Sequence, residues 1–153
     1  MASPAPVYLD YNATTPVHPR VREAMLPWLG DHWGNPSSAH AYGRDAAQAV
    51  ARARTEVATL VGAAPEHIVF TGGGTEADNL ALRGPTPARR RIVISSVEHP
   101  AVELPAKALE QQGWSRTELP VDPRGRVDLE RARTLLAEPA GIVSVILGQN
   151  ETG

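Results

Sequence analysis

The sequence predicts an α/β fold, in which a mostly parallel sheet is flanked by helices. Short runs of β-branched and aromatic residues alternate with longer segments whose apolar residues recur at helical spacing. This alternation is typical of parallel strands joined by helical crossovers, which cover both faces of the sheet. At 153 residues, the chain is long enough to bury a sizeable core.

The first part of the chain is predicted to hold an arm and two helices. Residues 1–6 are rich in proline and alanine, and we expect them to be mobile. A helix is expected over 19–29, with proline in its first turn and Gly30 near its end. Apolar residues then recur at helical spacing over 39–61, and Gly62 closes this long helix.

Strands and helices alternate over the rest of the chain. Clusters of β-branched residues predict strands over 67–71, 91–95, 115–119 and 142–147. Helical spacing and flanking residues predict helices over 75–83, 100–112 and 129–137. Proline opens the second of these helices, and Asp128 can cap the third.

Polar clusters follow three of the predicted strands, at residues 72–79, 95–99 and 149–153. In parallel α/β sheets, ligands bind beyond the carboxyl ends of the strands. The shared location of the three clusters therefore predicts one binding site at that edge of the sheet.

The most informative cluster is the glycine turn Gly72-Gly73-Gly74, followed by Thr75 at the start of a predicted helix. Glycines let the backbone approach a ligand, and the N–H groups and dipole at a helix start favour an anion. No Gly-Lys-Ser/Thr follows, so we expect a single phosphate rather than a nucleoside triphosphate. Thr75 adds a hydroxyl and can also cap the helix. The alternative is a tight strand–helix corner without a ligand.

His99 and Asn150 are the candidate side chains of the other two clusters. His99 follows a predicted strand and precedes Pro100, which holds its backbone extended. An imidazole there can stack on an aromatic ligand or move a proton, and the alternative is a surface histidine at a helix start. The Asn150 amide can donate and accept hydrogen bonds, or it can be an ordinary turn residue.

Composition and charge exclude several classes of protein. The net charge is −2, and the arginine triplet 89–91 is interpreted as the solvent-exposed start of a strand, so neither nucleic acid nor an anionic membrane is an expected partner. Neither a signal peptide nor a membrane span is visible, and we expect a cytoplasmic location. The chain has no cysteine, hence no cysteine metal site or thiol nucleophile, and no metal is expected. The single lysine of the chain is Lys107. The sequence stops directly after a predicted strand and a turn, so we expect the chain to be the front part of a longer protein.

Five ordered motifs give the chain a family resemblance. They are Tyr8–Pro16, Gly34–His40, Phe70–Asn79, Glu98-His99 and Asn150–Gly153. In this order and spacing they resemble the cysteine desulfurases of the class V aminotransferase family, which are fold type I enzymes that use pyridoxal 5′-phosphate (PLP). The resemblance covers nearly the whole chain.

The resemblance implies a role for several residues. Gly74 and Thr75 match the pair that binds the PLP phosphate, and Asn150 matches the asparagine that contacts the ring hydroxyl. His99 matches a histidine that stacks on the ring and assists proton transfer, so it is expected to be both cofactor-binding and catalytic. Residues 13–15 and 35–40 match loops at the substrate entrance.

The implied reaction takes sulfur from L-cysteine, with PLP as the electron sink, and yields alanine and an enzyme persulfide for iron–sulfur cluster or thio-cofactor synthesis. A sulfur-acceptor protein and a homodimer are the implied partners. Residues 1–15 would be an arm or a small-domain segment, and residues 16–153 an incomplete PLP-binding large domain. Alternatives are a selenocysteine lyase, another class V aminotransferase, or a non-catalytic remnant of the fold.

The sequence departs from the family in two motifs and in what it does not contain. Gly72 stands where the family usually has serine, and Gln149 where it usually has asparagine. The family's Schiff-base lysine and sulfur-accepting cysteine match no residue of this chain. Lys107 lies in the middle of a predicted helix beside apolar residues, and we interpret it as solvent-facing. The 153 residues alone are therefore expected to be inactive.

Overall fold

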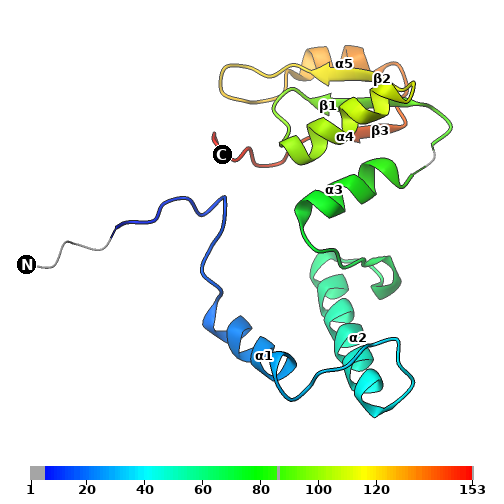
Figure 1. The fold of residues 1–153 in the computed structure, drawn as a ribbon. Helices are drawn as coiled ribbons and strands as arrows, with labels where there is room; N and C mark the ends of the chain where they lie inside the picture. Colours follow the sequence, from blue (N-terminus) through cyan, green and yellow to red (C-terminus); the bar gives the residue numbers. More distant parts are fainter. Residues whose placement is uncertain (1–5, 86, 153) are drawn as a thin grey trace, which may run out of the picture. The chain divides into compact units, whose positions relative to one another are not determined.

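The computed structural model describes residues 6–85 and 87–152. Most of the predicted arm at residues 1–6, together with Gly153 of the last motif, lies outside the described residues. The chain divides into two compact units between Phe70 and Thr71. Figure 1 shows the helices and strands of each unit along the chain.

Within its described residues, the first unit contains two helices and a short 3-10 turn. They are α1 (Pro19–Leu29), α2 (Ala41–Val61) and η1 (Pro65–His67). Histidine side chains cap both α-helices, because His18 Nδ1 accepts from the N–H of Arg20 and His40 Nδ1 accepts from the N–H of Gly43, each at 3.3 Å. The helix α2 ends at Gly62 in a left-handed conformation with φ of 68°. The expected helices 19–29 and 39–61 are confirmed, the second from Ala41 onward.

The predicted strand at 67–71 is wrong. His67 ends η1, and the residues after it form no strand, although Ile68 has extended dihedral angles of −92° and 126°. In the described part of the chain no strand pairs with residues 68–71. A β-branched run needs a partner for its backbone hydrogen bonds, so propensity alone does not make it a strand. The Arg54 guanidinium instead donates to the Ile68 carbonyl and lies 5.2 Å from the ring centre of Phe70.

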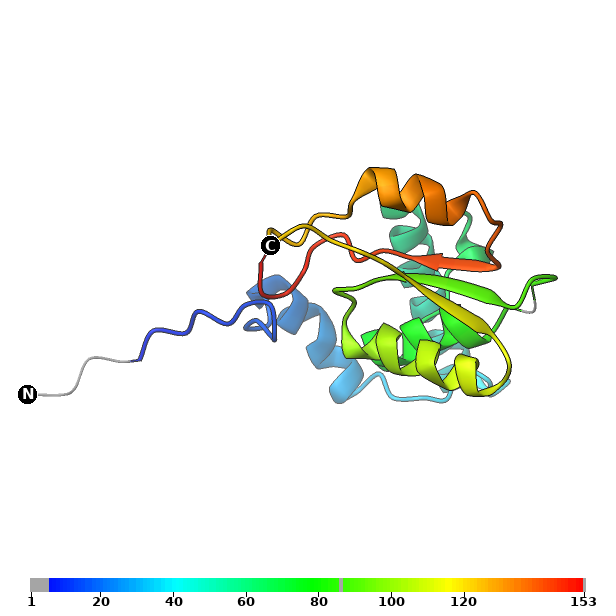
Figure 2. The ribbon, with the colours of Figure 1, turned by 90° about the horizontal axis from the view of Figure 1, so that it is seen from above.

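The second unit is a three-stranded parallel sheet with helices. Its elements are α3 (Gly74–Arg83), β1 (Arg91–Ser95), α4 (Pro100–Gln111), β2 (Ser115–Leu119), α5 (Leu129–Leu136) and β3 (Ile142–Ser144). The strand order is β2-β1-β3, and Val93 at the centre of β1 pairs with Thr117 and Val143. Figure 2 shows α4 and α5 on opposite sides of the sheet.

The core follows the alternation of side chains along β1, whose five residues are all buried. Ile92 and Ile94 pack with residues of α3 and α4, such as Leu82 and Val102, whereas Val93 packs on the other face with Ala132 of α5. The expected α/β fold, a parallel sheet flanked by helices, is therefore confirmed in this unit.

The last strand is shorter than expected, and Arg91 is buried where a solvent-exposed side chain was expected. The strand expected over 142–147 is paired only from Ile142 to Ser144, opposite Ile92–Ile94 of β1, and two residues further on the Ile146 N–H donates to the Glu98 side chain instead of a strand carbonyl. Arg91 is not part of a solvent-exposed strand start, because it is only 6% exposed. Its guanidinium donates to the carbonyls of Glu138 at 2.6 Å and Leu135 at 2.9 Å, which lie at the end of α5. Arg91 thus holds α5 to the sheet and supplies a positive charge at a helix C-terminus.

Candidate functional site

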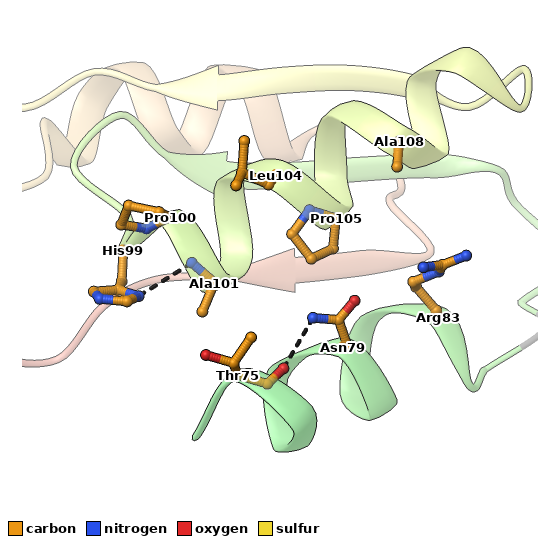
Figure 3. A pocket seen from close by; sticks show the side chains of 9 residues that line it. All are labelled: Thr75, Asn79, Arg83, His99, Pro100, Ala101, Leu104, Pro105 and Ala108. Carbon is orange, nitrogen blue, oxygen red and sulfur yellow. Dashed lines mark hydrogen bonds between the residues drawn. The ribbon is translucent and has the colours of Figure 1, made fainter. Parts of the chain in front are cut away.

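A pocket of about 460 Å³ lies between α3 and α4, within the range of ~300–1,000 Å³ typical of small-molecule sites. Figure 3 shows the residues of α3 facing those at the start and along one side of α4. The lining residues are Thr75, Asn79, Arg83, His99, Pro100, Ala101, Leu104, Pro105 and Ala108. The structure therefore brings Thr75 and His99, which lie far apart in the sequence, to one pocket.

His99 lines this pocket and also caps α4. Its backbone is extended, as expected before Pro100, and its Nδ1 accepts a hydrogen bond from the Ala101 N–H at 3.1 Å (Figure 3). Because Nδ1 is the acceptor, the hydrogen of the neutral ring is assigned to Nε2. The two interpretations of His99 are thus compatible, since a histidine at a helix start is also a pocket residue.

The glycine turn leads directly into α3. The helix begins at Gly74 after Gly73, and no side chain caps it, so the expected capping by Thr75 is wrong. Thr75 lies in the first turn and lines the pocket instead. The Gly72 N–H donates to the Glu76 carboxylate at 2.6 Å. A Cβ atom added at Gly73 or Gly74 would meet no atom within 4 Å, so there is open space beside the first N–H groups of the helix.

Asn150 lies in an exposed turn that follows β3. It does not belong to the residues that line the pocket of Thr75 and His99. The preceding Gln149 organises this turn, because its Oε1 accepts from the N–H groups of Glu151 at 2.6 Å and Thr152 at 2.8 Å. Since β1 and β3 are parallel neighbours, the segments of His99 and Asn150 both begin at the same edge of the sheet.

Two further polar residues line the pocket: Asn79, which ends the predicted cluster 72–79 but was given no role of its own, and Arg83, which was not expected from the sequence. Asn79 donates its side-chain N–H to the Thr75 carbonyl at 2.9 Å, and Arg83 brings a positive charge to the far end. Thr75, Asn79 and Arg83 are spaced four residues apart, which places them on one helix face, and that spacing could have revealed them. No carboxylate lies in the described lining. The arginine and the helix N-terminus together favour an anionic ligand.

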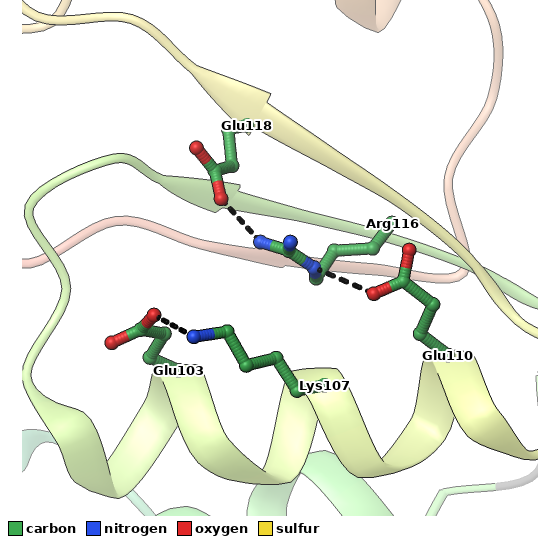
Figure 4. A network of polar contacts seen from close by, with 5 residues as sticks. All are labelled: Glu103, Lys107, Glu110, Arg116 and Glu118. Carbon is green, nitrogen blue, oxygen red and sulfur yellow. Dashed lines mark hydrogen bonds and ion pairs between the residues drawn. The ribbon is translucent and has the colours of Figure 1, made fainter.

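Lys107 does not line the pocket. It forms an ion pair with Glu103 one turn earlier on α4, and near this pair Arg116 forms separate ion pairs with Glu110 and Glu118 (Figure 4). The hydrogen bond from Lys107 lowers the pKa of Glu103. The expected solvent-facing position of Lys107 is confirmed, because its side chain is 49% exposed.

A parallel sheet covered on both faces, with a pocket between two of its helices that combines an apolar lining with a few polar side chains, is an architecture typical of α/β ligand-binding enzymes. The chain belongs to the aminotransferase class-V family, whose model matches residues 7–153. The resemblance found in the motifs is thereby confirmed. In the described part of the chain, no helix has the length and apolar character needed to cross a membrane.

Individual relatives agree with this assignment. The chain is 45% identical over 150 residues to a cysteine desulfurase of Trichormus azollae, and the match covers 96% of this chain and 38% of that protein. The solved structure of a NifS-like protein matches with a TM-score of 0.88 and 38% identity, covering 96% of this chain and 42% of the other. The structure of SspA in complex with cysteine matches with a TM-score of 0.85 and 33% identity, covering 94% and 43%. The chain therefore spans about two fifths of the length of these relatives.

Proposed function

We propose that this chain is the part of a PLP-dependent cysteine desulfurase that binds the phosphate of the cofactor. Such an enzyme removes sulfur from L-cysteine. The observation that carries the proposal is that Thr75 and His99 line one pocket with no carboxylate in its described lining. The names of the relatives support the substrate, because they include a cysteine desulfurase and a protein in complex with cysteine.

Residues of the pocket, together with Gly74 and Asn150, which lie outside its lining, fit the cofactor on chemical grounds. The open N-terminus of α3, with Gly74 and the Thr75 hydroxyl, offers N–H and O–H donors to a phosphate. The His99 imidazole offers a flat ring for stacking on a pyridine. Asn150 would contact the ring hydroxyl from the segment after β3. Bound PLP would supply an electron sink for the bonds at the substrate α-carbon.

The hydrogen bond of His99 restricts what this side chain can do with a proton. Because Nδ1 accepts the Ala101 N–H, the neutral imidazole can donate only from Nε2. Uptake of a proton at Nδ1 would require the ring to release its cap on α4. We infer that, while α4 stays capped, His99 serves as a hydrogen-bond donor through Nε2–H and as a ring support, and that any proton transfer by His99 requires Nδ1 to release the Ala101 N–H.

The complete reaction needs groups that these residues do not hold. The single lysine is in a surface ion pair, and the chain has no cysteine to accept sulfur. We propose that the Schiff-base lysine and the persulfide-forming cysteine are supplied outside these 153 residues, which alone are inactive. We further propose that the protein is a cytoplasmic homodimer and passes sulfur to an acceptor protein. In this proposal residues 1–15 form an arm or a small-domain segment, and residues 16–153 form the incomplete PLP-binding large domain.

Equilibrium binding of PLP and of pyridoxal, which lacks the phosphate, tests the proposal. We expect PLP to bind more tightly than pyridoxal, and Thr75→Val to weaken PLP binding by roughly tenfold, as for loss of a hydrogen bond to a charged group. Thr134→Val on α5 is the matched control, because its hydroxyl also donates within a helix, to the Glu130 carbonyl at 3.1 Å. Equal binding of PLP and pyridoxal would sink the proposal, as would a borohydride-stable adduct on Lys107.

A further inference from the structure

Glu98, one residue before His99, makes two hydrogen bonds with the same carboxylate oxygen. Its Oε1 accepts from the Ser95 hydroxyl at 2.8 Å and from the Ile146 N–H at 2.7 Å. Ser95 is the last residue of β1 and is 1% exposed, while Glu98 itself is half-buried. Hydrogen bonds to an ionised acceptor are among the stronger ones in proteins.

The bond to Ile146 joins two segments that are distant in the sequence. Ile146 lies two residues beyond the end of β3, where the ladder with β1 has stopped. The Glu98 carboxylate therefore takes the place of a backbone acceptor and extends the connection between the two strands past their paired residues. One of the joined segments carries His99, and the other leads to Asn150.

We propose that Glu98 is a positioning residue, which fixes the loop of His99 to the segment of Asn150 before a ligand binds. The proposal rests on the proposed function, because it is that function which makes His99 and Asn150 parts of one site. A site held in place by such supporting hydrogen bonds does not have to be ordered when the ligand arrives. Both bonds reach a single oxygen, so the carbonyl oxygen of a glutamine can accept them in the same place.

Three variants separate this role from general stability. Glu98→Ala removes the acceptor, Glu98→Gln keeps it, and Glu103→Ala on the surface of α4 is the control that breaks only the exposed pair with Lys107. Hydrogen exchange of the Ile146 amide reports the joint between the segments, and PLP titration reports the site. Glu98→Met, which keeps the length of the side chain without the oxygen, replaces Glu98→Ala if that variant does not fold.

In Glu98→Ala, we expect the Ile146 amide to exchange roughly tenfold faster or more, as for loss of a hydrogen bond to a charged group, and PLP to bind several-fold more weakly. Glu103→Ala should stay within about twofold of the wild type in both measurements, because it leaves the Glu98 acceptor in place, and Glu98→Gln should lie between the wild type and Glu98→Ala, because it keeps the accepting oxygen without the charge. Unchanged exchange at Ile146 in Glu98→Ala would overturn the inference. So would faster exchange of all sheet amides alike, or a glutamine variant as impaired as the alanine one. If the wild-type chain binds no PLP, the proposed function fails, and the exchange rates still decide whether Glu98 joins the segments.

Discussion

Substitution of His99 separates its structural role from its proposed role in the site. The His99 Nδ1 accepts the Ala101 N–H at 3.1 Å, which makes this side chain the N-cap of α4. Loss of an N-cap costs about 1 kcal/mol, whereas asparagine is among the best N-cap residues. His99→Ala should therefore lower the free energy of unfolding by about 1 kcal/mol, and His99→Asn by close to zero. Urea denaturation followed by circular dichroism measures both.

The affinity for PLP should depend on the imidazole ring of His99 and not on its role as the N-cap of α4. Stacking of an aromatic ring is worth about 1 kcal/mol, so both variants should bind PLP about fivefold more weakly. His18→Ala is the control, because His18 caps α1 in the same way, through its Nδ1 and the Arg20 N–H. It should lose stability and keep its PLP affinity. Wild-type affinity in His99→Asn would refute the role of the ring, and wild-type stability in His99→Ala would refute the cap.

Three further predictions concern stability and pH. Arg91→Met should lower the free energy of unfolding by about 3 kcal/mol in urea denaturation, because it removes charged donors from two carbonyls, whereas the neighbouring exposed Arg89→Met should change it by less than about 0.5 kcal/mol. Gly43→Ala should cost about 2 kcal/mol or more, seen as a lower melting temperature, because its Cβ would overlap a backbone carbonyl of the preceding loop. The hydrogen bond from Arg126 lowers the pKa of Asp122, so this carboxylate stabilises its turn above the ordinary pKa, and the contribution is lost as pH falls through the lowered one. In an NMR titration the Arg126 amide should therefore shift only below about pH 4, and movement near neutral pH would contradict this assignment.

Local sequence patterns were sufficient for the elements whose limits depend on nearby residues. The helix α1 has the bounds that were predicted from the proline at its start and the glycine after its end. The strands β1 and β2 also have their predicted bounds. The predicted strand at 67–71 failed because a strand also needs a partner, which no local pattern reveals. Arg91 was misplaced for a similar reason, since its acceptors lie more than forty residues away, with sequence separations of 44 and 47.

The candidate site shows the same division. His99 was predicted from its position between a strand and Pro100, and Thr75 from its position directly after the glycine turn. The fold brings both residues to one pocket. The joining role of Glu98 could not be found, because its acceptor bond to Ile146 spans 48 residues. The sequence could not predict that Asn150 lies outside the lining of the pocket, because the position of this residue depends on how the chain turns after β3.

The central claim is that the starts of α3 and α4 together receive PLP, and an NMR titration of the isotope-labelled chain tests it most directly. We predict saturable shifts of the amides of Gly74 and Thr75 and of the His99 ring, with one common affinity. The shifts should be much smaller with pyridoxal and in Thr75→Val. Saturable shifts confined to other residues, or none at all with PLP in large excess, would contradict the account.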